Sequence, residues 1–129
     1  MGGSLWVVGV DGKGARRISG LAHPADWARW SPDGRKILFA TQRTAPLGVI
    51  WTVSPDGSDL VKLFVDPTGR FPITPTWSPD GSLILFALDP TNDEFTHPNN
   101  SLDVINADGT HLQQVIGAAD FKRWPEWWK

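Results

Sequence analysis

One phrase is written twice in this 129-residue sequence, and it limits the possible folds more than any other feature. WSPDGRKILFA at 30–40 returns as WSPDGSLILFA at 77–87, which is 47 positions later. A second phrase, a short apolar run that leads into Asp-Gly, occurs three times, at 5–12, 50–57 and 102–109. The order of the phrases never changes. Regular repetition of this kind is typical of arrays of supersecondary units.

The Ser-Pro-Asp-Gly part of the first phrase predicts a tight turn. Pro32 presets φ for the second turn position, Asp33 suits the third, and Gly34 accepts the left-handed conformation that closes a hairpin. The Asp-Gly pairs of the second phrase predict turns of the same kind. We therefore interpret these aspartates as turn residues in preference to calcium ligands or acid-base pairs, because equivalent copies recur in equivalent turns.

The residues that follow each turn predict strands. The runs 36–41 and 83–88 are apolar at nearly every position, which favours strands buried on both faces. The runs after each Asp-Gly alternate with polar residues, among them Arg16, Lys62 and Gln114, as expected of outer edge strands. With 13 Gly and 11 Pro and no sustained helical periodicity, the sequence predicts an all-β chain.

A four-stranded unit of about 40 to 50 residues, repeated in series and buried on both faces, is typical of a β-propeller blade. The WSPDG phrase followed by the Asp-Gly phrase resembles the propeller repeats of the TolB family, and of the propellers of prolyl-oligopeptidase-like and tricorn-like proteases. We expect a partial TolB-like β-propeller of about three blades in one domain over 1–129. Its expected parts are two strands of a first blade (1–20), a second blade (21–66), a third blade (67–117) and the first strand of a further blade (118–129).

Composition narrows the classes of partner. The formal net charge is -2 and the basic residues form only pairs, so we expect no nucleic-acid partner. Cysteine is absent, which excludes disulfides and thiolate metal sites. No apolar run approaches the ~20 residues that cross a bilayer, and the first residues lack signal-peptide features, so we expect no membrane insertion. The compartment stays undetermined, and the resemblance implies the periplasm if the chain belongs to a TolB-like protein.

The connections that vary in length all lie at one end of the predicted blades. The tight turns lie at one end, whereas the connections 41–48, 66–73 and 89–100 lie at the other, where loops on a rigid scaffold usually carry binding sites. We expect a protein partner to be bound there. The candidate contact residues are Arg43, Arg70, Asp89, Asn92, Asp93, Glu94, His97, Trp27 and Trp124.

Catalytic signatures are missing from the sequence. There is no G-x-S-x-G, H-E-x-x-H or Walker motif, and the only histidines are His23, His97 and His111. The 89–100 connection carries carboxylates and amides that suit Ca²⁺, but their spacing is not that of an EF-hand. We expect a non-enzymatic scaffold without catalytic residues, metal or cofactor. The alternative is an accessory propeller of a prolyl-oligopeptidase-like or other hydrolase, with the catalytic domain elsewhere.

Eight tryptophans and no tyrosine indicate repeated packing positions. Trp30, Trp77 and Trp127 recur at one position of the repeat, and Trp6 and Trp51 at another, so we expect all five to pack between blades. Trp27, Trp124 and Trp128 fall outside that pattern. A carbohydrate-stacking surface on these three is a further hypothesis.

The strand count leaves the predicted ring open. Known propellers need roughly 4 to 8 blades, and this chain supplies about three. We expect association with a second copy, as in a head-to-tail dimer of six blades, or with the rest of a longer chain.

Overall fold

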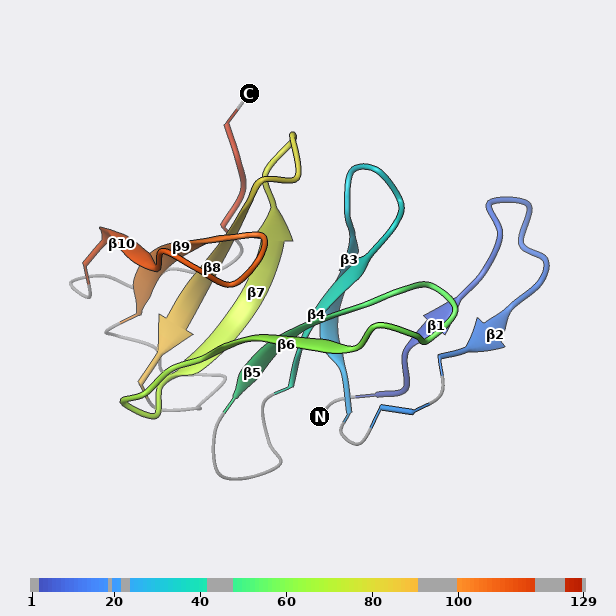
Figure 1. Ribbon diagram of the computed structural model, residues 1–129, viewed down its shortest axis with the longest axis horizontal. Helices are drawn as coiled ribbons and strands as arrows, with labels where there is room; N and C mark the ends of the chain where they lie inside the picture. The colour runs from blue at the N-terminus through green and yellow to red at the C-terminus, as the bar shows by residue number, and fades with distance from the viewer. Residues whose placement is uncertain are drawn as a thin grey trace.

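The computed structural model describes residues 3–18, 20–21, 24–41, 48–90, 100–117 and 125–128. These residues form ten strands and no helix, arranged in three antiparallel sheets (Figure 1). The strands are β1 (Trp6–Val7), β2 (Arg16–Arg17), β3 (Asp26–Trp30), β4 (Ile37–Thr41), β5 (Val49–Val53), β6 (Val61–Val65), β7 (Phe71–Trp77), β8 (Leu83–Asp89), β9 (Ser101–Asn106) and β10 (Gln113–Ile116). The all-β prediction is confirmed.

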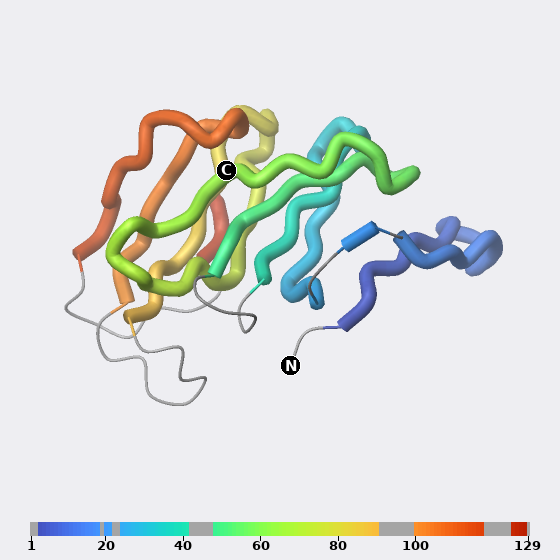
Figure 2. The backbone as a smooth tube through the Cα atoms, turned by 60° about the horizontal axis from the view of Figure 1, so that its bottom comes forward, coloured from blue at the N-terminus to red at the C-terminus, as the bar shows by residue number. Residues whose placement is uncertain are grey.

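Each sheet follows chain order. The first sheet pairs β1 with β2, the second runs β3-β4-β5-β6, and the third runs β7-β8-β9-β10. The sheets stand side by side like blades, with β7 against β3 and β4 of the preceding sheet (Figure 2). The predicted strands at 36–41 and 83–88 correspond to β4 and β8. We call the second and third sheets the two complete blades.

The two Ser-Pro-Asp-Gly turns have the predicted geometry. Gly34 and Gly81 adopt φ of 71° and 75°, and their N–H groups donate to the carbonyls of Ser31 and Ser78, both at 2.9 Å. Only glycine takes this conformation without a steric penalty. Both turns lie at the same end of the blades, at the top of Figure 1.

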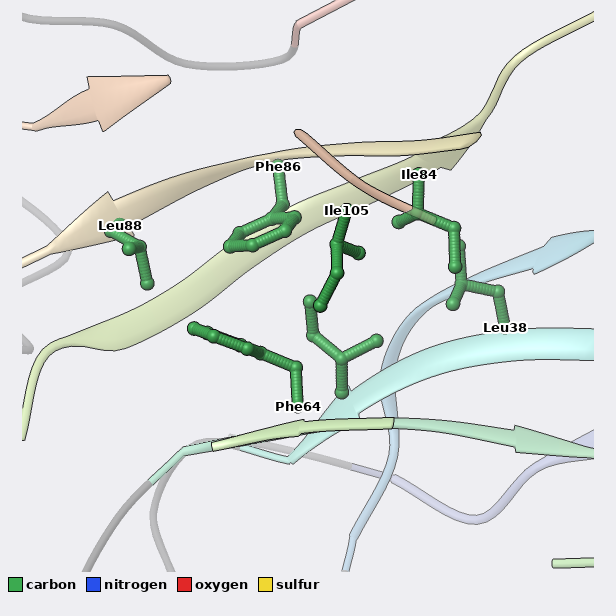
Figure 3. Close-up of a cluster of buried hydrophobic side chains, with 7 residues drawn as sticks. Leu38, Phe64, Ile84, Phe86, Leu88 and Ile105 are labelled. Carbon is green, nitrogen blue, oxygen red and sulfur yellow. The ribbon is translucent and has the colours of Figure 1, made fainter. Parts of the chain in front are cut away.

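Apolar side chains fill the spaces between the sheets. Along β4, Ile37 and Phe39 pack toward the first sheet with Leu5 and Ile18, whereas Leu38 packs toward the third sheet. On that second side the ring of Phe86 lies 5.1 Å from that of Phe64, with neighbouring side chains around them (Figure 3). The predicted burial of β4 and β8 on both faces is confirmed, and this burial is the main force that holds one blade on the next.

The outer strands are exposed, as predicted. Both residues of β2 and all four of β10 are solvent-exposed, and β6 is exposed at Val61 and Lys62. Arg16, Arg17, Lys62, Gln113 and Gln114 are the polar residues at these edges, whereas Val61, Val115 and Ile116 are exposed apolar residues.

Both inner strands carry an irregularity at the same position of the repeat. The register shifts between Asp26 and Arg29 in β3 and between Ile73 and Thr76 in β7. Trp27 and Thr74, each three residues before the repeated Trp, have φ of 52° and 49°. Trp27 therefore shares its backbone conformation, though not its residue type, with Thr74 of the next blade, in a repeated bulge of the inner strand.

Candidate functional site

The connection from β6 to β7 passes from one complete blade to the other, and Asp66 fixes its shape. Asp66 is 1% exposed. Its Oδ2 accepts from the backbone N–H of Thr68 at 3.1 Å and of Arg70 at 3.0 Å, and also from the Thr68 hydroxyl. The carboxylate therefore replaces the water that these donors would otherwise bind, and holds the connection in one conformation.

Arg70 completes this arrangement from the far end of the connection. Its Nη2 donates to Oδ1 of Asp66 at 2.9 Å, and its Nε donates to Oδ2 at 3.2 Å. A two-point contact of this kind uses the planar fork of the guanidinium. Nη1 reaches Ser101 Oγ of β9 at 3.4 Å, and the side chain of Arg70 remains about one-third exposed.

Ser101 and Asp103 extend the polar cluster into the third sheet. Both are buried, and Ser101 Oγ donates to Asp103 Oδ2 at 2.5 Å. Asp103 stands at the repeat position that Trp6 and Trp51 occupy in the other two copies of the Asp-Gly phrase. We did not predict Asp103 as a site residue, although this exchange of Trp for Asp is visible in the sequence.

The pKa values of the two acidic groups in the cluster, Asp66 and Asp103, are shifted in opposite directions. Burial raises the pKa of Asp66, but hydrogen bonds from Arg70 and Thr68 outweigh it and the net pKa is lowered. Burial also raises the pKa of Asp103, and there the Ser101 hydrogen bond and the Arg70 charge do not compensate, so the pKa remains above its ordinary value. Hydrogen bonding to Asp66 raises the pKa of Arg70.

Three of the predicted contact residues lie in the described part of the chain. Arg70 belongs to the cluster and is partly exposed, and Trp27 lies half-buried on β3. Asp89 ends β8 and is 1% exposed, so its side chain is part of the interior and not of the surface. The other predicted contacts, Arg43, Asn92, Asp93, Glu94, His97 and Trp124, lie outside the described residues.

The cluster places a hydroxyl beside a carboxylate, which is part of what a nucleophilic site needs. A nucleophilic site would also need a base that can activate the Ser101 hydroxyl. His111, in the described chain, lies instead after the β9–β10 turn, with Nδ1 3.1 Å from Asn106 Nδ2. No group of three metal-binding side chains occurs among the described residues, and none of these residues forms a helix suited to crossing a membrane. The contacts support a structural role: a charge pair within the β6–β7 connection and a hydrogen bond from Arg70 to β9 of the third sheet.

The repeated tryptophans do not all pack between blades. Trp6 and Trp30 are 59% and 51% exposed, so the packing prediction is wrong for both. Trp6 shares its repeat position with Trp51, which packs toward the preceding sheet, and no sheet precedes β1 in the described chain. Trp51 is half-buried, donates from Nε1 to Thr41 Oγ1 at 3.1 Å and lies under the Lys62 ammonium. Trp127 donates to the Thr76 carbonyl at 3.4 Å, beside β7.

No protein-family model and no curated protein sequence matches this chain. Solved structures do match it. A protein assigned as TolB from Agrobacterium tumefaciens is 25% identical with a TM-score of 0.70, over 91% of this chain and 43% of that one. TolB from Acinetobacter baumannii is 18% identical with a TM-score of 0.66, over 86% and 26%. Oligogalacturonate lyase in complex with manganese is 22% identical with a TM-score of 0.63, over 87% and 28%.

The chain spans less than half the length of each of these three proteins. The similarity covers the repeated blades described above, and its reach across both TolB and a lyase shows that this architecture serves more than one function. The chain has the fold of part of a TolB-like β-propeller.

Proposed function

We propose that the chain is a non-catalytic part of a β-propeller scaffold, which binds a protein partner at the end that bears the long connections. The observation that carries the proposal is the Asp66–Arg70 pair, which holds the β6–β7 connection rigid and leaves part of the guanidinium exposed. The connections after Thr41 and after Asp89 begin at this same end. A rigid platform lowers the entropy that a partner must lose on binding.

Position-specific cross-linking tests this proposal. A photo-reactive residue placed at Pro67 or Pro90, both exposed at this end, should give a defined protein adduct in cells that make the protein. The same residue at Gln114, exposed on the outer strand β10, is the matched control and should give none. Equal adducts from all three positions, or none from positions 67 and 90, would contradict the proposal.

We further propose that the ring is completed by a second copy or by the rest of a longer chain. The exposed face of β1 supports this, because Trp6 presents there the large apolar surface that Trp51 buries between sheets. Light scattering of the chain tests it. A dimer that Trp6→Ser converts to monomer, while Leu60→Ser in the exposed β5–β6 turn does not, supports self-association. A compact wild-type monomer favours the longer chain.

The second candidate function is the propeller part of an enzyme, such as an accessory domain of a hydrolase. The similarity to oligogalacturonate lyase favours it. A longer reading frame that carries a G-x-S-x-G segment would support the hydrolase version of this candidate, and a frame without one would count against it.

A further inference from the structure

Two hollows lie beside the tight turns, at the opposite end of the blades from the long connections. The first, of about 520 Å³, is bounded by Asp33 of the β3–β4 turn, by Asp80 and Gly81 of the β7–β8 turn, and by the ring of Trp77. The two turns lie close together, because a Cβ placed on Gly81 would be 3.5 Å from Pro32 Cδ. Residues 47 positions apart therefore form one concave surface.

The two carboxylates in this hollow are held in place by their own turns. Asp33 Oδ1 accepts from Ser31 Oγ at 2.7 Å, and Asp80 Oδ1 accepts from Ser78 Oγ at 2.6 Å. Within the described chain, every hydrogen bond to these two groups goes to Oδ1, and Oδ2 accepts none. These hydrogen bonds lower the pKa of Asp33, and that of Asp80 to about 2, so both groups are ionised at neutral pH.

One cation also lines this hollow, but its ammonium is already engaged. Lys36 Nζ donates to Ser54 Oγ at 3.0 Å and lies 3.6 Å from Asp59 Oδ2. Asp59 offsets the Lys36 charge, and Arg35 of the β3–β4 turn partly offsets that of Asp33. Asp80 still gives the hollow a net negative character that suits a cationic group.

Trp77 connects this hollow to the second one. The second, of about 370 Å³, lies between Trp30, Trp77 and Trp127, and the oppositely charged Arg29 and Glu126 also line it. Trp30, which lines this second hollow, is about half exposed. An acidic recess and an aromatic recess thus meet at a single indole ring.

We propose that this double hollow binds an arginine side chain, together with its apolar neighbour, from a segment of a protein partner. A guanidinium stacks on the face of Trp and donates in its plane to carboxylates, so it matches Trp77, Asp33 and Asp80 together. The apolar neighbour occupies the recess between the tryptophans. A lysine ammonium cannot form the same planar contacts, and we expect it to bind more weakly.

The test uses the 129-residue chain and a blocked peptide, Gly-Leu-Arg-Leu-Gly. Its matched control is the same peptide with citrulline, which keeps the shape of arginine and removes its charge. Titration followed by NMR should move the Trp77 indole N–H signal with the arginine peptide, with a Kd of about 1 mM, since exposed charge pairs each contribute little. Equal binding of the citrulline peptide would overturn the proposal, and so would no binding of either peptide.

Substitutions of the two aspartates test whether the peptide binds in this hollow. Asp33→Asn and Asp80→Asn should each weaken binding about fivefold. Asp56→Asn is the matched control, because Asp56 holds an equivalent exposed turn through Ser58 but does not line the hollow, and it should leave binding unchanged. Unchanged amide spectra elsewhere verify the fold of each variant. If neither Asp33→Asn nor Asp80→Asn weakens binding, the assignment to this hollow is wrong.

Discussion

Arg70 and Asp66 meet through two hydrogen bonds across the connection that joins the two complete blades, Nη2 to Oδ1 at 2.9 Å and Nε to Oδ2 at 3.2 Å. The carboxylate is buried, whereas the guanidinium is partly exposed. The pair therefore ties the position of one blade to the next at the end where we propose that a partner binds.

Replacing Asp66 should destabilise the chain. Asp66→Asn removes the buried negative charge that the Arg70 guanidinium contacts and leaves donors of Thr68 and Arg70 without a full partner, so we expect a loss of about 2 kcal/mol in the free energy of unfolding. Urea denaturation measures it, with the exposed turn variant Asp56→Asn as control. Because the pKa of Asp66 is lowered in the folded state, its contribution is present above about pH 4 and is lost as the pH falls through the folded pKa. A difference between wild type and variant that does not shrink in acid would contradict this role.

The buried Asp103 should act on stability in the opposite direction. Its pKa is raised in the folded state, so the folded chain binds more protons than the unfolded chain, and stability falls as the pH rises above about 4. Asp103→Asn keeps a similar shape and removes this titration. The variant should lose less stability than wild type between about pH 4 and pH 7, as measured by thermal unfolding across that range. Parallel profiles for the two proteins would show that Asp103 does not titrate abnormally.

Thr74 carries backbone strain that glycine should relieve. It is a β-branched residue at φ 49°, and its buried hydroxyl has no hydrogen-bond partner among the described residues. Left-handed backbone at such a residue costs about 1–2 kcal/mol. We expect Thr74→Gly to raise the free energy of unfolding by roughly 0.5–1 kcal/mol, after the entropy cost of glycine. Thr76→Gly, in the same strand without positive φ, should destabilise instead. If both variants lose stability, the bulge is not strained.

The contact between Phe64 and Phe86 should be a main source of stability between blades. Phe86 is fully buried and its ring faces Phe64. Phe86→Ala removes that packing and leaves a cavity, for which we expect a loss of about 3–5 kcal/mol in urea denaturation. Trp128→Ala removes a larger ring that is 97% exposed, and it should have little effect. Similar losses from the two substitutions would mean that side-chain burial does not determine the change in the free energy of unfolding.

The local structure could be predicted from the sequence because its causes are local. Pro32 and Gly34 fix a turn within four residues, and the run at 36–41 is apolar enough to require burial on both faces, which β4 shows at Ile37–Thr41. The Asp-Gly phrase likewise predicted where the outer strands begin. Repetition then implied blades, since each such unit needs a neighbour to cover its faces.

The candidate site could not be predicted in the same way. Asp66 was not selected at all, and Asp89 was expected at the surface although it is buried. Two of the five tryptophans expected between blades, Trp6 and Trp30, are exposed. In the described chain no sheet precedes β1, and the sheet before β3 has only two strands, so a repeat position specifies packing only where the neighbouring sheet is complete.

The sequence by itself therefore determined the strands, the tight turns and the repeated blade, because φ preferences and apolar periodicity act over a few residues. Only the tertiary structure decided which side chains meet. Arg70 reaches Ser101 from 31 positions away, and Asp33 shares a hollow with Asp80 from the next blade. Such contacts depend on how one blade packs and twists on another, and that packing is set by the summed burial of many side chains and not by any single motif.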